Sequence, residues 1–445
     1  MSNTRDDFSR LSSLAAKRLS RRDAVRAGAV GLSASGLASI PGVARAAVQD
    51  TGYGGEEASL TYGFWDASQR PAVEEQIAAF NEEFPNITVE PQVVPFDDYW
   101  TKLQTGIAGG SIYDVFWSNT ANLPVFAAQG ALLPIEPIIA AGGATGIDPG
   151  LYPDALIEAY THDGVLFGIP RDFDTIALFY NTELFDAAGV EYPTADWTWE
   201  DLYQAAKQLT ADGEGGPWGF SPTLSTQQTY YNFVKQNKGE ILNEEQSVAL
   251  LDSPESCEAF EYLTRFFEEN LAPPIPVQQA NDPYDTLFPA GQIAMMPGGS
   301  WHVRTFSEAN PAIKVAPLPQ GEQHASAIHG LANVIWEGSP NQAAAFEFVR
   351  FLATEEAEQV LGESATVIPA MEGLQEAWVA SVPEMDLQVF LDALDYAFPL
   401  PAPTSGPEWE AEVEQVLIEG WSGNIAAEDM CVQAAQVAND ALPGE

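Results

Sequence analysis

The chain has 445 residues, and its 64 acidic and 18 basic side chains give a formal net charge of −46. Nucleic acid and anionic lipid bind basic surfaces, so this charge excludes both as expected partners. Hydrophobic residues make up 46% of the chain and aromatic residues 11%, which is enough for a folded core and argues against a disordered acidic chain. The length predicts two domains.

The first 46 residues have the composition of an export signal. They hold 8 of the 18 basic and 3 of the 64 acidic side chains. An arginine pair, a small and mostly apolar run, and an Ala-x-Ala cleavage site follow one another at 21–22, 27–43 and 44–46. This order resembles a twin-arginine signal. We therefore predict a signal peptide at 1–46 and a flexible N-terminal stretch at 47–57.

The rest of the chain shows no membrane anchor. No cysteine stands near the cleavage region to carry a lipid, and no later stretch reaches the roughly 18 uninterrupted apolar residues of a membrane span. We expect a protein that is exported folded and is extracellular or periplasmic, without lipid anchor or transmembrane segment.

The acidity becomes more extreme once the signal is removed. Residues 47–445 carry 61 acids and 10 bases, and no Lys or Arg follows Arg350. In molar salt the Debye length falls to about 3 Å, which screens the repulsion among these carboxylates. The sequence therefore predicts a halophilic protein that loses structure when salt is withdrawn.

The two cysteines, Cys257 and Cys431, are far apart in the sequence and outside any metal-ligand spacing. A disulfide is permitted in an exported protein, and two unrelated buried thiols fit the sequence equally well. No other pattern indicates a metal site or a cofactor, and we expect neither.

Strands and helices alternate after the N-terminal stretch. Strands are predicted at Ala58–Phe64, Ile87–Val94 and Asp114–Trp117, and helices at Pro71–Asn81 and from Asp97 to the glycine pair at 109–110. This order predicts an α/β fold with a mainly parallel sheet between helices.

Two aromatic-polar pairs stand at the predicted ends of strands. Trp65 and Asp66 follow the first strand, and Trp117 and Ser118 come at the end of the third. Ligands of open α/β sheets bind at the carboxyl ends of the strands. We therefore expect both pairs on that rim.

A long motif and a series of shorter ones then occur in one order along the chain. The long motif is 169–181, and the shorter ones are 100–104, 108–111, 114–117, 130–134, 189–199, 252–255, 299–301, 317–319, 330–332, 346–353 and 368–370. Together they resemble the family 1 extracellular solute-binding proteins, the sugar receptors of ATP-driven importers. The resemblance covers residues 58 to about 380.

The resemblance implies a two-lobed periplasmic-binding-protein fold, in which each lobe is a mainly parallel sheet flanked by helices and crossing segments form a hinge. The expected lobes are 58–172 with 332–378, and 176–329 with 384–445. The implied function is the substrate-binding component of an ABC importer. It captures a neutral sugar, oligosaccharide or polyol between the lobes and delivers it to membrane permease subunits; a monomer is expected.

Sugars present apolar C–H faces and a ring of hydroxyls, so their sites need aromatic platforms with carboxylates and amides around them. The expected ligand contacts are Trp65, Asp66, Tyr99, Trp117, Ser118, Arg171, Asp172, Asp174, Tyr231, Ser300, Trp301 and Gly330. The resemblance makes Trp301 the stacking residue of the second lobe and gives Asp66 and Asp174 hydroxyl-binding roles. The alternative for the aromatic residues is core packing, and for the acids it is a helix cap or a solvated surface position.

Three further points stay open at this level. Arg171 fits an ion pair with Asp172 or Asp174 as well as a ligand contact. His302 and His329 flank motif turns without companions at metal-ligand spacing, so local hydrogen bonding is the expected role of each.

An enzyme is not expected, because the chain has no Gly-x-Ser-x-Gly, His-Glu-x-x-His or Walker motif. With 61 acids, a carboxylate pair of the kind a glycosidase needs can always be found and indicates nothing. The alternatives to a transport receptor are a secreted glycoside hydrolase and a receptor that reports its ligand to a chemosensor.

Overall fold

The computed structural model describes residues 53–135, 139, 147–211 and 217–442. The predicted signal at 1–46 and the part of the N-terminal stretch at 47–52 lie outside these residues. Among the described helices, none is both long and apolar enough to cross a bilayer.

The first five predicted elements are confirmed, with small shifts at their ends. They are β1 (Ala58–Phe64), α2 (Arg70–Glu83), β2 (Ile87–Val93), α3 (Phe96–Gly109) and β3 (Val115–Asn119). Pro71 stands in the first turn of α2, and Gly110 ends α3 in the left-handed conformation at φ 69°. β1 pairs in parallel with both β2 and β3, as the alternation predicted.

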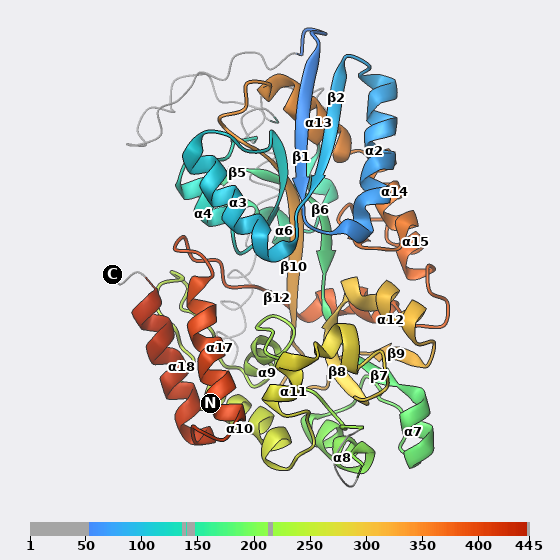
Figure 1. Ribbon diagram of the computed structural model, residues 1–445, viewed down its shortest axis with the longest axis vertical. Coiled ribbons are helices and arrows are strands. Elements are labelled where there is room, and N and C mark those ends of the chain that lie inside the picture. Colours follow the sequence, from blue (N-terminus) through green and yellow to red (C-terminus); the bar gives the residue numbers. More distant parts are fainter. Residues whose placement is uncertain (1–52, 136–138, 140–146, 212–216, 443–445) are drawn as a thin grey trace, which may run out of the picture. The chain divides into compact units, whose positions relative to one another are not determined.

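The larger sheet has seven strands among the described residues, in the order β11-β6-β10-β3-β1-β2, with β12 beside β10. Its other strands are β6 (Gly168–Asp174), β10 (Ser326–Ile335), β11 (Ile368–Pro369) and β12 (Ala397–Pro399). β10 runs antiparallel to β3 and β6, so the sheet is mixed. Figure 1 shows β10 and β6 running beside each other along much of their length.

Helices and a small hairpin accompany this sheet. They are α4 (Leu123–Ala128), η2 (Pro149–Leu151), α6 (Asp154–Ala159), β4 (Thr161–His162), β5 (Val165–Leu166), α13 (Gln342–Leu352), α14 (Glu355–Ser364) and α15 (Glu376–Val379). α13 packs on β1 and β10, and α14 packs on α2. Short 3-10 turn η1 (Ala67–Gln69) joins β1 to α2.

A second sheet has the order β8-β7-β9, from β7 (Ile176–Asn181), β8 (Met295–Gly299) and β9 (Ile313–Ala316). Both pairings with β7 are antiparallel, so the expectation of a mainly parallel sheet in each lobe is wrong here. The reason is topological. β8 and β9 run in the same direction on either side of β7, which enters between them directly from β6.

The remaining elements surround the second sheet. They are α7 (Thr182–Ala188), α8 (Trp199–Leu209), α9 (Tyr230–Gln236), α10 (Pro254–Glu268), α11 (Ile275–Ala280), η3 (Pro283–Leu287), η4 (Ser300–His302), α12 (Val303–Ala309), α16 (Gln388–Asp392), η5 (Ala393–Tyr396), α17 (Glu408–Trp421) and α18 (Ala427–Ala441). Figure 1 shows α17 and α18 side by side, in agreement with their extensive contact.

The chain crosses between the two sheets at two places, where β6 continues into β7 and where β10 begins. Thr175 alone separates β6 from β7, and its Oγ1 donates to the Phe390 carbonyl at 2.7 Å. Ser326 at the start of β10 accepts the Ile176 N–H at 2.9 Å. Hydrogen bonds at both crossings therefore fix the path of the backbone between the sheets.

Cys257 of α10 and Cys431 of α18 form a disulfide, with their Cα atoms 5.1 Å apart and 174 positions between them in the sequence. This decides the alternative that the sequence left open. The bond ties the C-terminal helix to the second sheet's helical layer, and closing so long a loop removes much entropy from the unfolded chain.

Candidate functional site

An aromatic cluster lies at the end of β1. Trp65 is partly exposed, and its ring centroid is 5.1 to 5.5 Å from those of Phe96, Tyr99, Trp100 and Trp117. Phe96 is 49% exposed, whereas Tyr99 and Trp117 are fully buried. Of the aromatic residues predicted on this rim, Trp65 therefore retains an accessible surface and Trp117 does not.

Trp117 and Ser118 lie within β3, so the predicted end of this strand at Trp117 is wrong and the pair does not follow the strand. β3 continues to Asn119 because β10 pairs with it there, with Asn333 opposite Trp117 and Ala332 opposite Ser118. Ser118 is fully buried, like Trp117. This pairing could not be predicted from the local sequence, since β10 follows some 200 residues later.

Hydrogen bonds hold Trp117 in the core. Its indole Nε1 donates to the Tyr62 hydroxyl at 2.6 Å, and that hydroxyl donates to Asn333 Oδ1 at 2.5 Å. The Tyr99 hydroxyl lies 2.8 Å from the Trp117 carbonyl oxygen. Burial raises the pKa of Tyr62 to about 12, so its hydroxyl stays protonated and keeps this chain of bonds intact.

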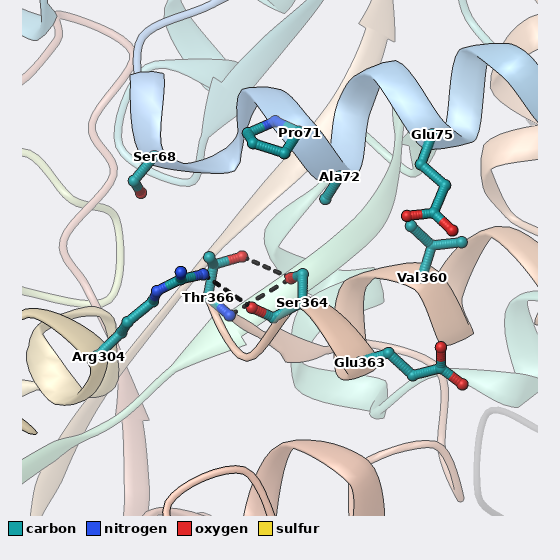
Figure 2. Close-up of a pocket in the computed structure, with 9 residues that line it drawn as sticks. All are labelled: Ser68, Pro71, Ala72, Glu75, Arg304, Val360, Glu363, Ser364 and Thr366. Carbon is teal, nitrogen blue, oxygen red and sulfur yellow. Dashed lines mark hydrogen bonds between the residues drawn. The ribbon is translucent and has the colours of Figure 1, made fainter. Parts of the chain in front are cut away.

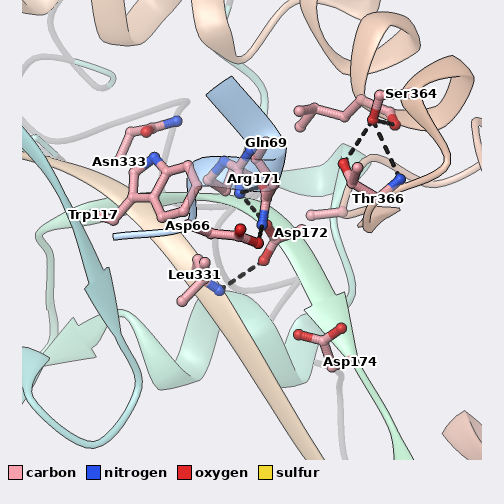
Figure 3. A network of polar contacts seen from close by, with 12 residues as sticks. Asp66, Gln69, Trp117, Arg171, Asp172, Asp174, Leu331, Asn333, Ser364 and Thr366 are labelled. Atoms are coloured by element: carbon pink, nitrogen blue, oxygen red, sulfur yellow. Dashed lines mark hydrogen bonds and ion pairs between the residues drawn. The ribbon is translucent and has the colours of Figure 1, made fainter. Parts of the chain in front are cut away.

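Arg171 and Asp172 of β6 form a buried ion pair (Figure 3). Arg171 Nη1 also donates to Gln69 Oε1 at 2.9 Å, and its guanidinium lies 4.1 Å from the Trp117 ring centroid. Asp172 accepts the Leu331 N–H at 3.1 Å. Burial raises the pKa of Asp172 to about 7, and Arg171 opposes that shift. Of the two roles left open for Arg171, the structure shows the ion pair.

Asp66 caps the 3-10 turn after β1. Its two carboxylate oxygens accept the Ser68 N–H at 2.8 Å and the Gln69 side-chain N–H at 2.9 Å. Asp66 is only partly buried, so the cap leaves its carboxylate in contact with solvent. Through Gln69 it is also linked to Arg171 (Figure 3).

Asp174, at the end of β6, contacts the turn that carries Trp301. Ser300 Oγ donates to Asp174 Oδ1 at 2.5 Å, and both residues are buried. Trp301 follows and is partly exposed, with its six-membered ring in the space that a Cβ on Gly299 would fill. Three of the predicted site residues are therefore brought together across β6 and η4.

A second group of side chains supports this turn. Gln228 Oε1 accepts the Gly299 N–H at 3.0 Å and lies 3.1 Å from His302 Nε2. The His302 ring stacks between Tyr284 and Phe306, at centroid distances of 4.5 and 5.0 Å. Burial lowers the pKa of His302 to about 3, so the ring is neutral. The expected local hydrogen bond of His302 is confirmed.

Tyr231 is fully buried on α9, where its hydroxyl donates to Glu410 Oε1 of α17 at 2.6 Å. Trp409 stacks on Tyr231 with their centroids 6.4 Å apart. Burial raises the pKa of Glu410 to about 7. Sequence reasoning missed Trp409 and Glu410, and the signal available was an aromatic-acid pair directly after the proline-rich stretch at 399–407.

Gly330 lies buried on β10 beside β6. A Cβ at this position would stand 2.8 Å from the Asp172 carbonyl oxygen and 3.2 Å from a methyl group of Leu156. The glycine is therefore required for the close approach of the two strands, a packing reason that stands beside its predicted ligand role.

A cavity of about 270 Å³ lies between α2 and α14 (Figure 2). Arg304 of α12 reaches it, and its Nη1 donates to the Ser364 carbonyl at 3.2 Å. The lining is Ser68, Pro71, Ala72, Glu75, Arg304, Val360, Glu363, Ser364 and Thr366, and it includes none of the twelve residues predicted from the sequence.

Residues 66–359 match the family of bacterial extracellular solute-binding proteins. A solved ABC substrate-binding protein from Listeria monocytogenes, in complex with cycloalternan, is similar with a TM-score of 0.81 and 28% identity, over 86% of this chain and 99% of that one. Two curated relatives are 25% identical. They are an arabinooligosaccharide-binding protein from Halalkalibacterium halodurans, with 64% of each chain covered, and the sn-glycerol-3-phosphate-binding periplasmic protein UgpB from Brucella melitensis, with 68% of this chain and 73% of that one covered.

The likeness in structure extends over nearly the whole of the described chain and confirms the two-lobed α/β fold predicted from the motifs. The family match covers the long motif in β6 and β7 and the turn that carries Trp301. The chain belongs to the bacterial extracellular solute-binding protein family.

Proposed function

We propose that this protein is the receptor of an ABC importer and captures a neutral carbohydrate between two lobes, 58–172 with 332–378 and 176–329 with 384–445. The observation that carries the proposal is the group formed by Asp174, Ser300 and Trp301. It combines a carboxylate, a hydroxyl and a partly exposed indole next to the crossing from one sheet to the other. Such a group matches the hydroxyls and the apolar face of a sugar ring.

The proposed roles divide the twelve predicted residues into two sets. Trp301 stacks on the sugar, Asp174 and Ser300 bind its hydroxyls, and Trp65 and Asp66 contact it from the first lobe, where both retain exposure. The other set frames the site from buried positions: Tyr99, Trp117, Ser118, Arg171, Asp172, Tyr231 and Gly330. Asp174 and Ser300 of the first set are buried as well.

The charge of the site favours a neutral ligand over a phosphorylated one. Phosphate groups are bound by cations with free donors, above all arginine. Arg171 is buried against Asp172 and Trp117. The charged side chains proposed to contact the ligand, the partly exposed Asp66 and the buried Asp174, are acids. A solute such as sn-glycerol 3-phosphate, named for one of the relatives, would meet repulsion at this site.

The proposal also includes how the protein is exported and the salt concentration in which it works. The twin-arginine signal at 1–46 exports the folded protein, multimolar salt screens its acidic surface, and the monomer hands its ligand unchanged to the permease. The absence of chemistry is part of the proposal because a carrier must release what it binds. Closure on the ligand stabilises the protein by about 2.7 kcal/mol at one hundred times the dissociation constant.

The test is calorimetric titration of the signal-free protein with mono- and oligosaccharides, together with chromatography of each saccharide after long incubation. We expect saturable binding and no new product. Trp301→Ala should weaken binding about 10- to 100-fold, because a desolvated aromatic face is lost. Trp197→Ala is the matched control, since Trp197 is also partly buried but packs on Phe185. Hydrolysis of the saccharide, or equal losses in both variants, would contradict the proposal.

A further inference from the structure

His329 is a partly exposed polar side chain that the site described above does not use. It lies on β10, opposite Asp174 of β6 in the antiparallel register. Its side chain is 13% exposed and that of Asp174 8%. Local hydrogen bonding was the role expected from the sequence. Among the described residues, however, His329 Nδ1 is buried without a hydrogen-bond partner.

The carboxylate of Asp174 lies beside His329 Nδ1. Its Oδ2 lies 3.8 Å from His329 Nδ1, which is too long for a hydrogen bond. The other oxygen, Oδ1, already accepts Ser300 Oγ at 2.5 Å. Figure 3 shows Asp174 apart from the Arg171–Asp172 ion pair. His329 Nδ1 and Asp174 Oδ2 thus lie close together without a hydrogen bond between them.

Burying a nitrogen without a hydrogen-bond partner costs free energy. A third group that forms a hydrogen bond with it removes that cost. An oxygen atom about 2.8 Å from each atom completes a triangle on the 3.8 Å separation. A hydroxyl is the group that fits, because its oxygen accepts from an imidazole N–H and its own proton is donated to a carboxylate oxygen. A fully ionised phosphate or carboxylate of a ligand has no hydrogen to donate to the Asp174 oxygen.

We propose that His329 Nδ1 and Asp174 Oδ2 together bind one hydroxyl of the ligand, which makes His329 a specificity-determining residue. The inference rests on the proposed carbohydrate function and sharpens it. Trp301 stands directly after Ser300, whose hydroxyl bonds the same carboxylate, so a sugar ring stacked on the indole carries its edge toward this pair. The position selects a ring with a hydroxyl there over one that is deoxygenated or alkylated.

The experiment is calorimetric titration with maltotriose, arabinotriose and mannotriose and their monosaccharides, in multimolar salt. His329→Ala should weaken binding of the saccharide about tenfold, the upper value for one hydrogen bond between neutral groups. His329→Gln keeps an N–H donor and should stay within about threefold of the unsubstituted protein. His324→Ala is the matched control, because that histidine packs on Tyr396 and is expected to leave affinity unchanged.

A double-mutant cycle tests whether the two residues share one hydroxyl. Asp174→Asn and His329→Ala should be strongly non-additive, whereas additive losses overturn the inference. Unchanged affinity in His329→Ala overturns it too and leaves the proposed function standing. Equal losses of affinity and melting temperature in both His329 variants would indicate a structural role. If the unsubstituted protein binds none of these saccharides, the proposed function fails and the role of His329 fails with it.

Discussion

Two carboxylates on one strand, Asp172 and Asp174, have opposite surroundings. Asp172 is fully buried, and Arg171 and the Leu331 N–H occupy its oxygens. Within the described part of the chain, the Asp174 carboxylate accepts one hydrogen bond, from Ser300 at 2.5 Å, and stands beside a histidine nitrogen without a partner. Both oxygens of Asp172 are thus occupied, which makes its surroundings the closed region even though Arg171 Nη2 is buried without a hydrogen-bond partner there. Oδ2 of Asp174 is left for a ligand.

In a protein with so many acids, the surroundings of each carboxylate separate structural residues from binding residues. Removing one partner of a buried ion pair leaves the other charge without compensation and therefore affects folding. A carboxylate with one oxygen available affects binding instead. Four experiments on substituted proteins test this contrast, in order of decreasing effect.

Arg171→Met removes the cation from the closed region. We expect a loss of about 3 to 5 kcal/mol in the free energy of unfolding, because Asp172 is left buried without its partner. Denaturant unfolding in multimolar salt measures it. The double variant Arg171→Met with Asp172→Leu should recover much of the loss, and a single variant as stable as the unsubstituted protein would refute the closed network.

Glu410→Gln examines a third arrangement, a carboxyl kept neutral by burial. The pKa of Glu410 is raised from 4.5 to about 7, so the folded state holds the extra proton between these values. Stability from this group is therefore full below about pH 4.5 and is lost as pH rises to about 7, a change of about 3 kcal/mol. The glutamine keeps the bond from Tyr231 and should abolish that part of the pH dependence. Identical pH profiles of unfolding in both proteins would show that Glu410 is charged.

Asp174→Asn and Asp172→Asn are the matched pair within β6. Asp174→Asn should weaken saccharide binding about tenfold and change stability by less than about 1 kcal/mol. Asp172→Asn should do the reverse, lowering stability because Arg171 loses its counter-charge. Calorimetric titration and thermal unfolding of both variants decide, and the same phenotype in the two would remove the distinction.

Arg304→Gln tests the cavity in Figure 2, which is outside the proposed site. Arg304 is half exposed and pairs with Glu308 at 3.0 Å, so its contribution to stability should be below about 0.5 kcal/mol. Saccharide affinity should stay within about twofold of the unsubstituted protein. A tenfold loss would move the cavity into the binding site.

The regular part of the fold was predictable because its signals are local. The periodicity of residues 58–109, with Pro71 and Gly110 at helix ends, is sufficient for β1, α2, β2 and α3. The direction of β7 and the extension of β3 past Trp117 were not, since both depend on strands that arrive more than 100 residues later. The disulfide was undecidable for the same reason, because it depends on the packing of α10 against α18.

The motifs in the sequence were sufficient to predict which residues belong to the candidate site. They were not sufficient to predict what surrounds each side chain. Asp172 and Asp174 stand in one motif and look alike in the sequence. What separates them is Arg171 on one side and Ser300, 126 positions away, on the other. Glu410 and Trp409 lie outside every motif, and only the packing of α17 on α9 brings them to Tyr231.

The most direct measurement is a thermal-shift screen of the signal-free protein in multimolar salt, with neutral saccharides, polyols, amino acids, sugar phosphates and sn-glycerol 3-phosphate. The account predicts a saturable rise in melting temperature with one series of neutral saccharides, and a rise that shrinks in Asp174→Asn but persists in Arg304→Gln. A rise with sn-glycerol 3-phosphate or another anionic solute, and none with any saccharide, would contradict it.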